Sequence, residues 1–257
     1  MKRKRTTHHT EDLFSEFTQE AVRIVEEGKK RNVVLRILGA TAVRLHCSKF
    51  RYLFEEMARR PTDIDFMAYG KDRPLLRNLF KEVGYQPDER IITLHGYRRH
   101  IYHQEEKSIT VDIFFDKLEF CHTIAFSGRL EIDSPTVTLA DLLLTKMQIV
   151  KLNEKDVKDA IILFTEHDIG ETNNEMIDAA YIARTLSDDW GFYYTFTTNM
   201  KRVAELVKEF ASLNDEERAD VLARVNKVLG MVEAQPKSFK WKMRARVGTS
   251  SKWYNEV

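Results

Sequence analysis

The residues best suited to chemistry in this sequence are three aspartates, Asp63, Asp65 and Asp112. Asp63 and Asp65 stand two positions apart in a predicted strand, Thr-Asp-Ile-Asp-Phe, so both carboxylates are expected on one face of that strand. Asp112 lies between apolar residues in another predicted strand, where a carboxylate requires a partner. Neighbouring carboxylates repel each other unless a cation lies between them. The pattern predicts a divalent-metal site of the kind used in phosphoryl transfer, and the alternative is a set of surface acids.

A glycine turn precedes these acids. Gly39 follows the apolar strand predicted over residues 33–38, and a helix is predicted to begin at this glycine. Glycine allows the backbone to bend sharply, and the amides at the start of a helix can receive a triphosphate. Ala40 offers an amide without a hydroxyl, so a phosphate contact through a side chain is expected from Thr41. The alternative is an ordinary turn between a strand and a helix.

Two further residues, Arg60 and Thr62, directly precede the aspartates. They are expected to contact phosphates or to orient Asp63. The alternative is that they cap a strand.

Together these residues resemble a known signature. Gly39-Ala40 before a helix, Asp63-x-Asp65 and the later Asp112 resemble the signature of the nucleotidyltransferase superfamily, which has the polymerase-beta-like fold. The resemblance covers residues 30–165. It is strongest to the minimal nucleotidyltransferases grouped with abortive-infection toxins, because Lys146 and Lys158-Asp159 also fit that subgroup. The family more often has glycine or serine where this chain has Ala40.

The resemblance implies a magnesium-dependent enzyme. Such an enzyme transfers a nucleoside monophosphate from a nucleoside triphosphate, ATP among them, to a hydroxyl of RNA, of a protein or of a small molecule. Asp63 and Asp65 would bridge two magnesium ions, and Asp112 would hold the ion that activates the hydroxyl. The resemblance also implies a toxin-antitoxin pair with a partner protein. The alternative is a retired member of the fold that binds only a nucleotide or a partner protein.

The same resemblance assigns roles to two residues of the helical part. Lys146 is a candidate to neutralise phosphate charge, and Asp159 is expected to support catalysis or to order Lys146. The alternatives are a solvated surface lysine and a helix-surface acid paired with Lys155 four residues earlier.

The hydrophobic pattern predicts an α+β protein. The resemblance implies that residues 1–168 form a nucleotidyltransferase fold, in which helices flank a mixed, mostly antiparallel sheet. Residues 169–257 are expected to form a helical domain with a basic aromatic tail. The predicted helices include residues 42–57, residues 138–152 capped by Thr138, residues 174–186, residues 200–213, and residues 215–231 with a capping box at Asn214. The predicted strands include residues 90–94, 97–103 and 108–115.

Composition limits the class of protein. The 41 Lys and Arg residues nearly balance the 40 Asp and Glu residues, which argues against a chain that is strongly basic throughout. Cys47 and Cys121 are too few for a disulfide framework, and a cytoplasmic protein is expected. No apolar run is long enough to span a membrane, so no membrane partner is expected.

Two aromatic segments leave alternatives open. The tail over residues 237–254 interleaves cations with aromatic residues, so it could bind nucleic acid, form a solvated arm or pack on its own domain. Residues 190–196 are rich in aromatic side chains, which are expected to pack in the core or to line an acceptor pocket.

Overall fold

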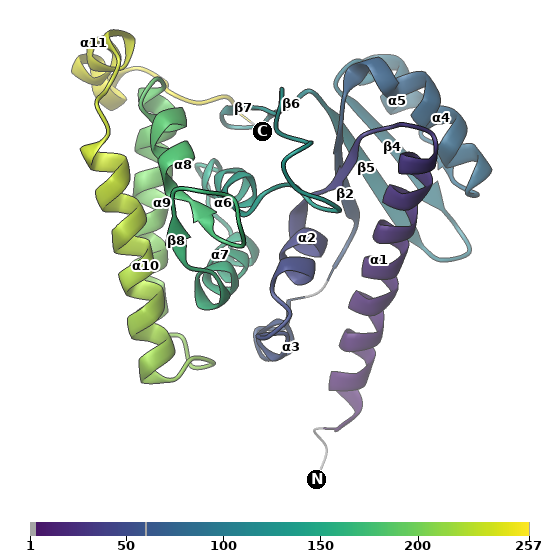
Figure 1. The fold of residues 1–257 in the computed structure, drawn as a ribbon, viewed down its shortest axis with the longest axis horizontal. Helices are drawn as coiled ribbons and strands as arrows, with labels where there is room; N and C mark the ends of the chain where they lie inside the picture. Colours follow the sequence, from purple (N-terminus) through teal and green to yellow (C-terminus); the bar gives the residue numbers. More distant parts are fainter. Residues whose placement is uncertain (1–3, 60, 257) are drawn as a thin grey trace. The chain divides into compact units, whose positions relative to one another are not determined.

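A computed structural model describes residues 4–59 and 61–256, with side chains from Phe14 onward (Figure 1). The protein is α+β, as predicted, with a mixed sheet and a helical C-terminal region. It divides into two compact units. The first unit comprises the residues up to 118 together with residues 125–137, and the second comprises residues 119–124 together with those from 138 onward. The predicted boundary near residue 168 lies within the second unit.

A five-stranded sheet forms the centre of the first unit. Its strands, in spatial order, are β1 (Leu35–Ile37), β2 (Ile64–Ala68), β5 (Ile109–Phe115), β4 (Arg99–Gln104) and β3 (Gln86–Pro87). Strands β2 and β5 are parallel, and the other neighbours are antiparallel. The sheet is therefore mixed and mostly antiparallel, as the sequence predicted.

The helices of the first unit precede or connect these strands. They are α1 (Lys4–Lys30), α2 (Gly39–His46), α3 (Tyr52–Glu56), η1 (Gly70–Asp72), α4 (Arg73–Glu82) and α5 (Glu89–His95). Strands β6 (Lys117–Glu119) and β7 (Thr123–Ala125) follow β5 along the chain.

Two predictions about these helices were wrong. The single helix predicted over residues 42–57 is divided into α2 and α3. Tertiary contacts favour the break, because Arg44 of α2 lies over the rings of Phe14 and Phe54 and donates a hydrogen bond to the Arg51 carbonyl. The strand predicted over residues 90–94 is helix α5, because the Asp88 side chain caps its N-terminus by accepting a hydrogen bond from the Ile91 amide at 3.0 Å.

The two faces of the sheet differ in chemistry. One face is apolar and buried, and it includes Leu35, Ile37, Ile64, Phe66, Ala68, Val111, Ile113, Phe115 and Tyr102. Helix α4 packs on this face, where the ring of Phe80 stacks on Tyr102 with 4.4 Å between ring centroids. Each large apolar side chain buried here contributes about 1.5–3 kcal/mol. The strand register places Asp65, Asp112 and Arg99 on the opposite face.

The second unit is mainly helical. Its elements are α6 (Leu139–Met147), α7 (Glu154–Glu166), β8 (Ile169–Gly170), β9 (Ile177–Asp178), α8 (Ala179–Leu186), α9 (Trp190–Lys208), α10 (Asp215–Ala234), α11 (Phe239–Val247) and η2 (Gly248–Ser250). Figure 1 shows α10 running beside α8 and α9.

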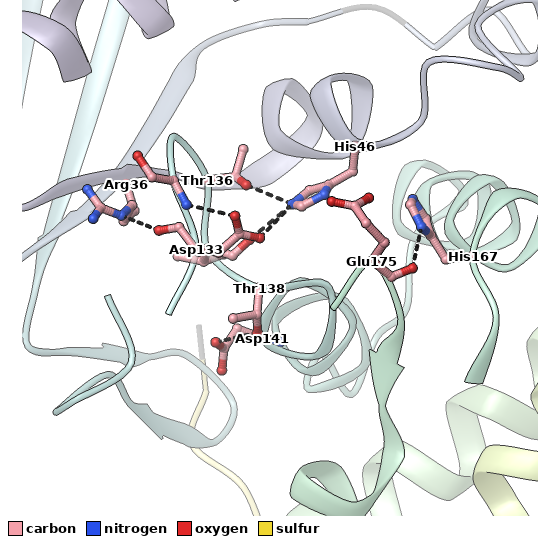
Figure 2. Close-up of polar contacts among 10 residues, drawn as sticks. Arg36, His46, Asp133, Thr136, Thr138, Asp141, His167 and Glu175 are labelled. Atoms are coloured by element: carbon pink, nitrogen blue, oxygen red, sulfur yellow. Dashed lines mark hydrogen bonds and ion pairs between the residues drawn. The ribbon is translucent and has the colours of Figure 1, made fainter. Parts of the chain in front are cut away.

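Local capping signals explain where several of these helices begin. The predicted caps are confirmed, because Thr138 accepts a hydrogen bond from the Asp141 amide (Figure 2), and Asn214 forms a capping box with Glu217. Helix α9 begins ten residues before the predicted start at 200, since Asp189 caps it. Among the described residues, no helix is long and apolar enough to cross a membrane.

Candidate functional site

Two of the three predicted aspartates are paired across the parallel strands. Asp65 of β2 and Asp112 of β5 are direct partners in the strand register, so both side chains leave the same face of the sheet. Asp63 is exposed and precedes β2, which begins at Ile64, so its predicted place in the strand was wrong. Pairing with β5 starts at Ile64, opposite Val111, and this explains the difference. The Thr62 hydroxyl donates a hydrogen bond to Asp63 Oδ1 at 3.0 Å, which holds that carboxylate.

The glycine turn lies directly against one of these carboxylates. Gly39 has a φ of +65°, a conformation that strains residues with a side chain, and a β-carbon there would overlap Asp65 Oδ2 and lie 3.2 Å from Asp65 Cγ. The Leu38 amide donates a hydrogen bond to the Asp65 carbonyl at 2.8 Å. Glycine is thus required both by the backbone conformation and by the position of the Asp65 carboxylate.

Helix α2 begins at this turn. In the described part of the chain, Leu38, the residue before its first turn, caps the helix with no side-chain hydrogen bond, and the amides of Gly39 and Ala40 belong to this first turn. Thr41 is only 1% exposed, and its hydroxyl has no hydrogen-bond partner among the described residues. Amides at the start of a helix, together with an unpaired hydroxyl, provide donors for an anionic group such as a phosphate.

The other end of α2 is also held in place (Figure 2). His46 Nε2 lies 2.7 Å from the Thr136 hydroxyl and 3.2 Å from the Val137 carbonyl. The segment that carries these partners runs beside β1, where the Ile37 amide donates a hydrogen bond to the Pro135 carbonyl at 2.9 Å. These contacts position the C-terminal end of α2.

Arg99 binds Asp112, and sequence reasoning did not find this arginine. Asp112 is only 6% exposed. Arg99 Nε lies 2.8 Å and 2.9 Å from the two carboxylate oxygens, and Arg99 Nη2 donates a further hydrogen bond to Oδ2. Arg99 and Asp112 belong to neighbouring antiparallel strands, so the pairing depends on a register that no local pattern reveals.

Charge in the site follows from these contacts. Burial raises the pKa of the Asp112 carboxyl, the hydrogen bonds from Arg99 oppose this shift, and the negative charge of Asp63 adds to it. The hydrogen bonds with Asp112 raise the pKa of Arg99, and the charges of Asp65 and Asp63 contribute to that rise. The positive charge of Arg99 thus lies under the influence of the carboxylates of Asp112, Asp65 and Asp63.

The site fits magnesium in its donor chemistry, because carboxylate oxygens are the protein ligands that magnesium prefers. Within the described residues, however, no group of three or more His, Cys, Asp or Glu side chains is gathered so that it could hold a metal ion. Arg99 binds Asp112, and Asp63 is exposed to solvent.

Two of the predicted residues, Lys146 and Asp159, lie in the second unit. Lys146 of α6 lies 2.7 Å from Asp159 and 3.2 Å from Asp156, both of α7. Lys146 is only 9% exposed and Asp159 is fully buried, so the alternatives of a solvated lysine and of an Asp159–Lys155 pair on the helix surface were wrong. Packing of α6 against α7 creates the pair, which is consistent with an ordering role for Asp159. The role of Lys146 toward phosphate stays a prediction.

The aromatic segments pack on their own unit. Trp241 of α11 meets the ring of Tyr193 edge to face at 5.1 Å, and Trp253 Nε1 donates a hydrogen bond to the Thr195 hydroxyl at 3.2 Å. Trp190 stacks on Tyr194 at 5.2 Å. These contacts agree with the packing alternative for both segments. A pocket of about 240 Å³ lies beside the three tryptophans.

Arg60, the last predicted site residue, lies outside the described residues. No family model matches the sequence, and a comparison with curated proteins gives no match. Functional assignment therefore depends on the chemistry of the residues themselves.

Proposed function

We propose that this protein is a magnesium-dependent nucleotidyltransferase that moves a nucleoside monophosphate from a nucleoside triphosphate to a hydroxyl acceptor. The observation that carries the proposal is the contact of the Gly39 turn with the Asp65 carboxylate, beside Asp112 on the parallel strand. A metal–triphosphate complex carries both positive and negative charge. The Gly39 turn provides amides for the phosphates of such a complex. Asp65 and Asp112 provide carboxylates for its cation at an adjacent position.

In this proposal each residue has a defined task. The amides of Gly39 and Ala40 and the hydroxyl of Thr41 bind phosphate oxygens, while Asp63, Asp65 and Asp112 would hold magnesium. The acceptor oxygen attacks the α-phosphorus, the bond to pyrophosphate breaks, and the proton of the acceptor hydroxyl passes to solvent water. The chemistry that bound magnesium supplies is neutralisation of charge on the phosphates and acidification of the attacking hydroxyl.

The proposal is tested by measuring pyrophosphate release. Purified protein is incubated with magnesium, each of four nucleoside triphosphates and a cell extract as the source of acceptors. We expect the variants Asp63→Asn and Asp65→Asn each to lose at least 100-fold in rate while remaining folded, since each lacks a carboxylate on which the proposed cation depends. The matched control is Asp220→Asn, which removes one exposed carboxylate from α10. Equal rates in all variants would contradict the proposal.

A retired member of the fold, acting as a nucleotide-binding or protein-interaction module, is the second candidate. The hydrogen bonds of Arg99 with Asp112 favour it, because an arginine that remained there permanently would leave this carboxylate unavailable to a cation. Calorimetry with magnesium and a triphosphate separates the candidates. Binding without pyrophosphate release in any extract would support the retired form.

A toxin of a two-gene system with RNA or a protein as acceptor remains a narrower version of the same proposal. It is motivated by the resemblance through Lys146 and Lys158-Asp159. Growth arrest on expression, relieved by Asp63→Ala, is the expected result, and harmless expression of active protein would count against it.

A further inference from the structure

Arg99 differs from its partner in exposure. The Asp112 side chain is 8% exposed, whereas that of Arg99 is 43% exposed. The guanidinium contacts both oxygens of the carboxylate, and the charges of Asp65 and Asp63 also stabilise it. The charged end of a half-exposed side chain is therefore the cation that accompanies the buried Asp112 carboxylate, beside Asp65 on the neighbouring strand.

Burial explains why Asp112 needs this cation. An ionised carboxylate without a partner in an apolar environment costs several kcal/mol, so something positive must accompany it. Because 43% of the Arg99 side chain lies in solvent, its charged end would stay hydrated if another cation took its place at Asp112.

We propose that Arg99 is an exchangeable counter-ion of the candidate site. Arg99 occupies Asp112 when no divalent cation is bound, a bound cation displaces it, and the released guanidinium then binds the triphosphate. The inference rests on the proposed function and adds a coupling between cation and nucleotide binding. Because the exchange links the two ligands, each one strengthens binding of the other.

The proposal predicts opposite effects of one substitution on the two ligands. Arg99→Gln removes the competitor for Asp112, so Mn²⁺ should bind to the nucleotide-free protein about 5-fold or more tightly than to the unmodified protein. The same variant lacks the guanidinium that contacts phosphate, so a non-hydrolysable ATP analogue should bind at least 5-fold more weakly at saturating Mn²⁺. If Arg99 had a purely structural role, Arg99→Gln would weaken the binding of both Mn²⁺ and the ATP analogue.

The experiment measures Mn²⁺ by the electron paramagnetic resonance signal of the unbound ion. Arg90→Gln is the matched control, because it removes an equal charge from an exposed position of α5. Arg99→Lys keeps the charge but not the paired hydrogen bonds, and it should lie between the unmodified protein and Arg99→Gln. If Arg99→Gln does not fold, the Lys variant decides, since equal or weaker Mn²⁺ binding in it overturns the inference.

The outcomes also separate this inference from the proposed function. The counter-ion role is overturned if the unmodified protein and Arg99→Gln bind Mn²⁺ with equal affinity. If Asp65→Asn has then lost Mn²⁺ binding, the proposed metal site is still supported. Failure of every form to bind Mn²⁺ overturns both. Binding by Arg99→Gln but not by the unmodified protein supports the counter-ion role.

Discussion

The Asp65 carboxylate occupies the space where a side chain at residue 39 would lie. A β-carbon built on Gly39 overlaps Asp65 Oδ2, and the glycine has a φ of +65°. The turn that opens α2 and the carboxylate of β2 therefore depend on each other. This relationship joins the start of a helix, which attracts anions, to a carboxylate, which attracts cations.

Replacing the glycine should separate these two features. We expect Gly39→Ala to lower the free energy of unfolding by about 1–3 kcal/mol, through backbone strain and displacement of Asp65, and to weaken binding of an ATP analogue at least 10-fold. Urea unfolding and calorimetry measure the two effects. The control is Gly230→Ala in the C-terminal half of α10, where an added β-carbon meets no atom within 4 Å. The free energy of unfolding of Gly230→Ala should rise by about 0.5–1 kcal/mol. Undiminished nucleotide binding in Gly39→Ala would contradict the role of the turn.

The buried pair in the second unit should behave as a coupled unit. Lys146→Met leaves the fully buried Asp159 without its 2.7 Å partner and should cost about 3–5 kcal/mol. Lys146→Met combined with Asp159→Leu should recover most of that loss, because no uncompensated charge then remains at residue 159. Tryptophan fluorescence during urea unfolding reports this unit, since all the tryptophans, Trp190, Trp241 and Trp253, belong to it. A double variant no more stable than the single one would refute the coupling.

Acid should destabilise the second unit through His122. Burial lowers the pKa of His122 from 6.5 to about 4 in the folded protein. The unfolded chain therefore binds a proton first as the pH falls, and stability decreases from about pH 6.5 to about pH 4. The loss due to this one group is on the order of 2–3 kcal/mol.

The measurement compares the unmodified protein with His122→Asn at several pH values by tryptophan fluorescence. The variant should be less stable at pH 7, because it lacks the stacking of His122 on Phe192 and the 2.8 Å contact with Thr195. Its stability should nevertheless depend less on pH over this window. An unchanged pH dependence would show that other groups carry the effect.

Much of the fold could be predicted from local signals. Apolar segments separated by turns predicted the α+β class and the mixed sheet, and Thr138 and Asn214 marked the starts of α6 and α10 because capping uses residues a few positions apart. Helix α5 was missed because the β-branched pair Ile91 and Ile92 favours a strand, whereas the Asp88 cap stabilises a helix.

The candidate site could be predicted only in part. The placement of Gly39 in a turn and of Asp65 and Asp112 in strands was predicted, because a turn and two strands are readable along the chain. The pairing of Arg99 with Asp112 depends on strand register, and that of Lys146 with Asp159 depends on how two helices pack. Contacts of this kind join residues that no sequence spacing connects.

The most direct test of the proposed function is the fate of the two ends of the triphosphate. Protein is incubated with magnesium, a cell extract and ATP labelled at either the α- or the γ-phosphate, with Asp65→Asn as the control, and the other triphosphates follow in the same way. Nucleotidyl transfer predicts that α-label becomes attached to an acceptor and that γ-label leaves in pyrophosphate, both dependent on Asp65. Attachment of γ-label, or absence of Asp65-dependent α-label with all four triphosphates, would contradict the account.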